Sequence, residues 1–244
     1  MTLDPLDKKY QKSPDFPPDK ADNWPYPPEQ DGWMLAHNSI RKEVEQMIEA
    51  LEACNKSGNV QQWQAACVKR FWKSHHSNED DVMTPYLETR VNYPEKLTSD
   101  HTDLVNKLDR VDALVESLGQ KEGDNLAELI KEMKEYKEIM FPHLKEEEEL
   151  GLPLSRAYFT KEEIGAQTQK ILSRAPKVEL GSFIVCQGVD EFRNGFMKRN
   201  QIPTIAWYAQ FKGCVAAFDQ EFTKPLEAVK TGTEPVEASC CTIQ

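Results

Sequence analysis

The chain has 244 residues and is strongly acidic, with 41 Asp and Glu against 30 Lys and Arg. This charge argues against nucleic acid and against an anionic membrane surface as electrostatic partners, because both are held by basic patches. The six cysteines show neither CxxC pairing nor the density of a disulfide scaffold, so we expect reduced thiols in a cytoplasmic protein.

Residues 1–31 contain seven prolines and no apolar segment of the signal-peptide type. Proline at this density resists helix and sheet, so we predict an extended arm laid on the domain surface. The alternative is that residues 24–27, with the sequence WPYP, form a proline-rich ligand for a partner. No apolar run in the chain is long enough to predict a transmembrane helix.

From Gly32 onward, apolar residues recur every three or four positions, which predicts helices with one buried face. The four predicted helices cover about 32–54, 60–90, 100–118 and 124–150. Thr98, Ser99 and Asp100 supply N-cap chemistry for the third helix, and Gly151 and Pro153 follow the fourth. Helices of this length with short connections pack antiparallel, so we predict an all-α fold with an up-down-up-down four-helix bundle over residues 32–155.

The remaining sequence continues as helix. Thr160 and Glu163 form a capping box that begins a helix ending near Arg174. Two further helices are predicted over about 181–200 and 203–229. We therefore expect residues 156–230 to be a helical extension packed on the bundle, followed by a flexible tail over 231–244.

One histidine in each of the four helices falls on the inward stripe. These residues are His37, His75, His101 and His143. Glu79 and Glu147 follow two of them by four residues, so each HxxxE pair shares a helix face. A single inward histidine is usually a hydrogen-bonded core residue, but buried carboxylates need a compensating positive charge and the stripes offer no Lys or Arg. The set therefore predicts a bound metal.

The ligand types indicate which metal this is. Carboxylates from opposite helices of a bundle naturally bridge two ions. Imidazole and carboxylate ligands favour iron over calcium or magnesium, and the lack of cysteine ligands argues against structural zinc, while manganese remains an alternative. Glu148 is an alternative to Glu147, although the spacing from His143 favours Glu147. His76 lies about 100° around its helix from the stripe, so we place it behind the ligands or at the surface, with ligation of the metal as the alternative.

These residues form a recognisable pattern of His37, HHSNE (75–79), His101 and HLKEE (143–147). The pattern resembles the hemerythrin-like HHE cation-binding domain family over about residues 32–155. Residues 160–230 are similar to the C-terminal extension of some eukaryotic members. The resemblance implies that His37 and His75 bind one iron, that His101 and His143 bind the other, and that Glu79 and Glu147 bridge them.

One departure from the oxygen-carrying members of this family affects function. Those members have a second histidine one turn after the first on the third helix, and Val105 stands at that position here. The neighbouring Leu104 and Leu108 cannot coordinate a metal. Each iron would then have an open position, which argues against stable reversible oxygen carriage.

The sequence supports two classes of function at this centre. The first is a di-iron protein that binds dioxygen or iron for sensing, storage or protection. The alternative is an enzyme that activates oxygen or reduces peroxide. No inward acid, base or nucleophile accompanies the ligands, and we interpret Tyr86 and Tyr136 as core residues, with a redox role as the alternative. We therefore place binding ahead of catalysis. A metal-free helical scaffold is the third possibility.

The last four residues, Cys241 to Gln244, fit the C-a-a-X pattern for prenylation. One prenyl chain gives only marginal membrane binding, so the adjacent Cys240 would supply a second signal through palmitoylation. This pattern predicts partial membrane association. The alternative is two unmodified thiols.

Overall fold

The computed structural model describes residues 4–19, 23–57, 63–64, 66, 71–118 and 126–233. Within these ranges the chain is helical and forms no strand beyond one isolated antiparallel bridge between Gln11 and Val91. This confirms the all-α class. No helix in the described ranges has both the length and the apolar character needed to cross a membrane.

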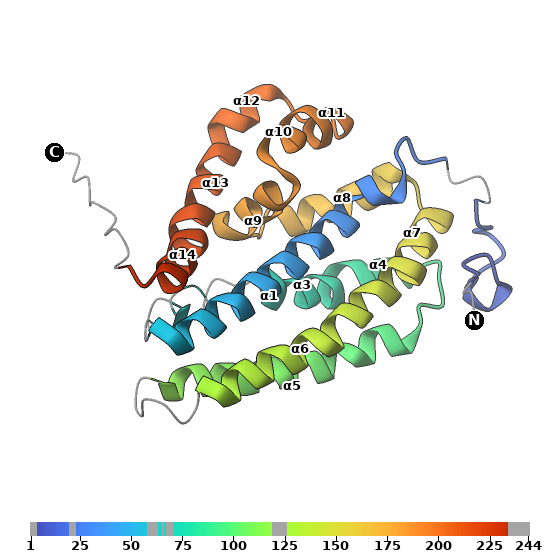
Figure 1. Ribbon diagram of the computed structural model, residues 1–244. Helices are drawn as coiled ribbons and strands as arrows, with labels where there is room; N and C mark the ends of the chain where they lie inside the picture. Colours follow the sequence, from blue (N-terminus) through green and yellow to red (C-terminus); the bar gives the residue numbers. More distant parts are fainter. Residues whose placement is uncertain are drawn as a thin grey trace.

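The histidines lie on four helices that occupy the centre of the fold. These are α1 (Gly32–Ser57), α3 (Phe71–Asn78), α5 (Glu95–Leu118) and α6 (Leu126–Glu146). In Figure 1, α5 lies along α6, α6 lies along α1, and α14 (Lys224–Thr231) covers the opposite side of α1. The buried apolar faces of these helices form one continuous core that includes Ile40, Leu104, Met133 and Phe222.

Two of these helices continue through π-helical turns. α3 passes through η3 (Glu79–Met83) into α4 (Thr84–Leu87), and α6 passes through η4 (Glu147–Gly151) into α7 (Leu152–Tyr158). A proline stands at the second position after each turn, at Pro85 and Pro153. Proline cannot donate to the carbonyl four residues back and its ring crowds that carbonyl, so a wider turn before it lets the helix continue.

This continuation corrects the predicted end of the fourth helix. Gly151 and Pro153 do not terminate it, and the helix runs on to Tyr158. The position between residues 155 and 156, where the sequence divides bundle from extension, thus lies inside α7. The predicted N-cap of the third helix is also wrong. α5 begins at Glu95, directly after Pro94, and the hydroxyls of Thr98 and Ser99 donate to carbonyls within the helix.

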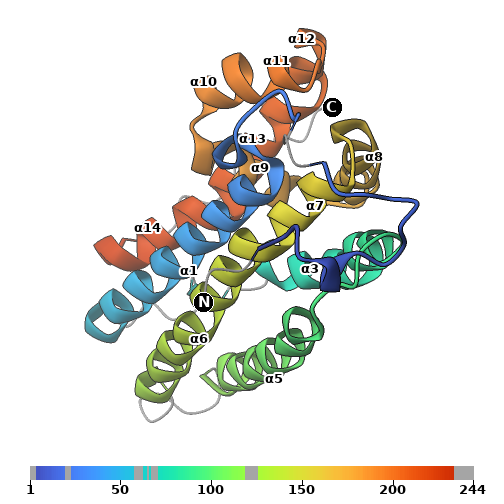
Figure 2. The same cartoon turned by 90° about the vertical axis from the view of Figure 1, so that its right-hand side faces the viewer.

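The C-terminal part begins with α8 (Lys161–Leu172), where the predicted capping box between Thr160 and Glu163 is present. The remaining elements are α9 (Lys177–Gln187), α10 (Val189–Glu191), η5 (Phe192–Phe196), α11 (Met197–Arg199), α12 (Thr204–Ala206), η6 (Trp207–Phe211), α13 (Lys212–Phe218), η7 (Asp219–Thr223) and α14. The helix predicted over 181–200 is interrupted at Gly188, whose φ of 93° favours glycine. A Cβ at Gly181 would meet the backbone oxygen of Cys214 at 2.1 Å, so glycine there permits the close crossing of α9 and α13. Figure 2 shows these helices stacked on one side of α1.

The N-terminal residues run over the surface near α4 and α7. Tyr10 is buried against this end of the molecule, and the Trp24 indole donates a hydrogen bond to the carbonyl of Phe159 at 3.1 Å. The guanidinium of Arg156 lies over the same indole, 4.8 Å from its centroid. These contacts fasten residues 4–19 and 23–31 to the helical domain.

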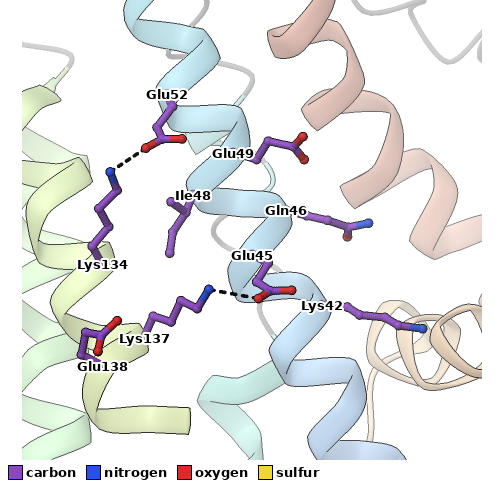
Figure 3. Close-up of a pocket in the computed structure, with 9 residues that line it drawn as sticks. All are labelled: Lys42, Glu45, Gln46, Ile48, Glu49, Glu52, Lys134, Lys137 and Glu138. Atoms are coloured by element: carbon purple, nitrogen blue, oxygen red, sulfur yellow. Dashed lines mark hydrogen bonds and ion pairs between the residues drawn. The ribbon is translucent and has the colours of Figure 1, made fainter.

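A large surface hollow of about 630 Å³ lies between α1 and α6 (Figure 3). Its lining residues are mostly charged and already pair across it. Lys134 contacts Glu52 at 2.6 Å, and Lys137 contacts Glu45 at 3.0 Å. No histidine lines this hollow, so we interpret its charges as ties between the two helices rather than as a ligand site.

Candidate metal centre

All five histidines of the chain converge in the interior, between α1, α3, α5 and α6. Their exposed fractions range from 0% to 8%, for His37, His75, His76, His101 and His143. The imidazoles of His37 and His75 lie edge to face with centroids 5.0 Å apart, and those of His101 and His143 do the same at 4.9 Å. One helix alone cannot build this cluster, because its rings come from four different segments.

The possible ligand atoms form two groups, each with its atoms within 4.8 Å of one another. The first group contains His37, His75, Glu79 and Glu147. The second contains His76, His101 and His143. Two such groups side by side are the arrangement expected for a pair of metal ions.

The two glutamates connect the groups. Glu79 places Oε1 at 3.2 Å from Nε2 of His75 and Oε2 at 3.7 Å from Nε2 of His101. Glu147 places Oε2 at 3.4 Å from Nε2 of His37 and Oε1 at 3.5 Å from Nε2 of His143. Each carboxylate thus borders both groups with different oxygens. Both glutamates begin a π-helical turn, a local distortion that often occurs at functional sites.

Several of these atoms are buried and make no hydrogen bond to the described protein. They are Nε2 of His37, His76, His101 and His143, both oxygens of Glu79, and Oε2 of Glu147. Buried polar atoms left unpaired cost free energy, and carboxylates cost most. A cation bound among them satisfies nitrogen lone pairs and carboxylate charge together, so this donor set fits a metal.

Three of the imidazoles have a carboxylate behind the ring nitrogen that faces away from the centre. Nδ1 of His37 lies 2.9 Å from Glu148, and Nδ1 of His101 lies 2.7 Å from Asp80. Nδ1 of His143 lies 3.7 Å from Asp100. The Nδ1 of His143 is too far from Asp100 for a hydrogen bond. For His37 and His101, an N–H donated to the carboxylate directs Nε2 to the centre, which is how outer carboxylates orient metal-binding histidines.

These carboxylates also change how the histidines titrate. Burial lowers the pKa of His37, but its hydrogen bond with Glu148 and the nearby Glu79 outweigh burial and raise it to about 9. For His101, Glu147 and the neighbouring acids likewise overcome burial and raise the pKa to about 9. In the metal-free protein both imidazoles therefore carry a second proton at neutral pH, and a metal ion that binds Nε2 must displace it. Burial holds the pKa of His76 well below its ordinary value, so this ring is neutral.

His76 is the main correction to the sequence analysis. It does not lie behind the ligands or at the surface, because its side chain is 2% exposed and its ring lies 4.6 Å from His101 and 5.5 Å from His143. Adjacent residues on a helix are separated by about 100°. When the direction midway between His75 and His76 faces the centre, both side chains lie in the interior. His75 then faces the first group and His76 the second.

Val105 is 47% exposed on α5, so its side chain does not face the centre. The sequence suggested that its lack of an imidazole leaves a position open there. The structure instead places His76, from α3, beside His101. The structure also distinguishes Glu148 from Glu147. Glu148 hydrogen-bonds His37 and pairs with Arg41 at 2.6 Å, whereas Glu147 points to the centre.

The two tyrosines considered in the sequence analysis lie in apolar surroundings. Tyr136 is fully buried in the core around α1 and α6. Tyr86 packs with Phe159, with ring centroids 5.1 Å apart. Cys240 and Cys241 lie outside the described residues, so prenylation stays a prediction that the intact mass of the protein from a eukaryotic host would check.

Glu179 of α9 is a buried acid next to the centre, and it accepts a hydrogen bond from Ser74 at 2.8 Å. Burial raises the pKa of its carboxyl to about 7. Since the folded pKa exceeds the ordinary one, ionisation opposes folding, and stability falls as pH rises from about 4.5 through 7. We expect Glu179→Gln to be more stable than the unmodified protein at pH 8, by roughly 1–2 kcal/mol after allowing for partial solvation.

Denaturant unfolding of both proteins at pH 8 and at pH 4.5 measures this effect. At pH 4.5 the difference should largely disappear, because the Glu179 carboxyl is then mostly protonated in the folded protein. Glu116→Gln, at an exposed position on α5, is the matched control and should change stability little at either pH. An equal gain for Glu179→Gln at both pH values would contradict the titration argument.

Comparison with known proteins is consistent with this geometry. Residues 30–155 match the family described as the hemerythrin HHE cation-binding domain. F-box/LRR-repeat protein 5 of Mus musculus is 29% identical over 162 residues, which cover 62% of this chain and 22% of the mouse protein. The matched part of the chain therefore spans less than a quarter of that relative. No solved structure matches the chain.

Proposed function

Because the chain belongs to the hemerythrin HHE cation-binding domain family, we propose that it binds a pair of iron ions bridged by Glu79 and Glu147. The bound iron serves to bind dioxygen, or to respond to iron itself, in sensing, storage or protection. The observation that carries this proposal is the division of the buried ligand atoms into two groups, with one oxygen of each glutamate directed to each group.

The proposal includes an up-down-up-down order for the four histidine-bearing helices. The colours in Figure 1 support it, since α6 runs opposite to its neighbours α1 and α5. In this order, HxxxE pairs on the second and fourth helices face each other across the interior. Both carboxylates can then reach the same two ions.

The two ions would have unequal surroundings. The first group offers two imidazoles and the second offers three, while both share the glutamates. Iron held by such nitrogen and oxygen donors supplies coordination positions for dioxygen or another small ligand. The ion near His37 and His75 has fewer protein donors, so we propose that the small ligand binds on that side. Unequal ions replace the pair of equally open sites expected from the sequence.

Metal analysis of the protein tests this function. Expression with ample iron should give about two irons per chain, and removal of the metal should lower the melting temperature because binding energy is coupled to folding. A ratio near zero would refute the proposal. Adding oxygen to the reduced protein then separates the functions. Persistent, reversible optical bands indicate binding, whereas continuous consumption of oxygen or peroxide indicates the alternative, an enzyme.

A further inference from the structure

A second feature of the molecule lies beside the metal centre. A cavity of about 120 Å³ occupies the space between the histidine-bearing helices and the C-terminal helices. Its walls are mainly apolar and include Trp33, Ala36, Ile164, Leu172, Leu180 and Phe183. Residues of α8 and α9 form much of this lining, so the C-terminal extension helps to build the cavity.

The cavity meets the centre on one side. His75 and Glu79, both of the first group, are part of its lining, whereas His76, His101 and His143 are not. The indole of Trp33 lies edge to face with His37 at a centroid distance of 6.3 Å. The cavity therefore leads to the group with fewer imidazoles.

The chemistry of the lining limits what the cavity accepts. An apolar cavity of roughly 150 Å³ in another protein stays dry and binds benzene or xenon, so a slightly smaller one suits a molecule of a few atoms. A charged ligand would lose its hydration against a mainly apolar wall, and the acidic side chains in the lining would repel an anion. The polar residues of the lining are Asp31, His75, Asn78, Glu79, Thr168 and Glu179, and the Nε1–H of Trp33 is buried without a hydrogen-bond partner among the described residues.

We propose that this cavity is a binding site for a small, uncharged, apolar molecule of the size of dioxygen, and that it delivers this molecule to the His37 and His75 side of the centre. The inference rests on the proposed function for the identity of the receiving metal. The cavity itself exists without that assumption. An experiment can therefore test binding in the cavity separately from the proposed function of the metal centre.

Xenon is the probe for the cavity, because it is apolar and does not depend on the redox state of iron. Crystals of the iron-loaded protein under xenon pressure should show the gas among Trp33, Leu172 and Phe183. Ala175→Leu, which extends a residue of the lining into this space, should abolish the peak. Ala206→Leu is the matched control, since Ala206 is equally half-buried in the same cluster but does not line the cavity.

The same variants test delivery to the metal. The second-order rate of oxidation of the reduced, iron-loaded protein by oxygen should fall about tenfold in Ala175→Leu, equivalent to about 1.4 kcal/mol, and stay unchanged in Ala206→Leu. If Ala175→Leu misfolds, Leu172→Ala serves instead, because it widens the cavity and should increase xenon occupancy without slowing oxidation.

Two results would overturn the inference. One is the absence of xenon from the cavity of the unmodified protein, and the other is an unchanged oxidation rate in a folded, fully loaded Ala175→Leu protein. Failure of the proposed function is recognised separately, because it appears as a chain that holds no iron while the xenon measurement still reports on the cavity.

Discussion

Replacing Glu147 with alanine should leave the protein with little bound iron, below about half an ion per chain after gel filtration. The side chain is 1% exposed, and its two oxygens lie 3.4 Å from His37 and 3.5 Å from His143. Its loss therefore removes a donor from both groups at once. Metal analysis and the melting temperature measure the effect, since stabilisation by bound metal should disappear with the metal.

The acidic run around Glu147 provides a matched control. Glu149 lies in the same π-helical turn but is exposed, and its ion pair among the described residues is with Lys145 at 3.6 Å. Glu149→Ala should retain its iron and change stability by less than about 0.5 kcal/mol. Glu148→Gln should give an intermediate result, weakening metal binding by roughly 10- to 100-fold through the orientation of His37. Full iron content in Glu147→Ala would contradict the bridging role.

Short-range sequence patterns predicted which of these side chains share a buried helix face. Helical periodicity placed four histidines on inward faces, and the i to i+4 rule placed a glutamate beside two of them. The structure buries these six residues together. Such relationships depend on the geometry of one helix at a time. They are therefore encoded within short stretches of sequence.

Relationships between helices could not be predicted in this way. Asp80 lies on η3 and Asp100 on α5, yet they face His101 and His143 on other segments. The side of α3 that faces the centre depends on how that helix is rotated, and a rotation of a few tens of degrees decides whether His76 is inside. The apolar cavity also depends on α8 and α9, whose docking no local pattern specifies. For the outer carboxylates, the sequence offered one signal, which is that Asp80 and Asp100 each stand next to a predicted ligand.

The predicted end of the fourth helix was wrong for a different reason. Pro153 was interpreted through the usual rule that proline interrupts a helix, whereas the predicted second helix ran through Pro85. The structure instead has a π-helical turn before each one, so the helix continues and the glutamate at the start of each turn lies at the centre. A proline six residues after a ligand carboxylate is thus part of how this chain shapes its site.

His76→Ala should lower the iron content from about two ions per chain to about one. Its ring is buried beside His101 and His143, and these three residues form the second group. Removing one of three imidazoles weakens that group, while His37, His75 and both glutamates remain around the other ion. The surviving ion borders the apolar cavity, so oxidation by oxygen should still occur at a similar rate per iron.

Ser77→Ala, at the next and exposed position of α3, should keep both ions and is the control for the helix itself. His101→Ala gives the comparison for ligation, because a true partner of His76 should lose the same single ion. If His101→Ala lost iron while His76→Ala kept about two ions, His76 would be a packing residue between ligands. The centre would then have two imidazoles on each side, and the unequal surroundings proposed for the ions would be wrong.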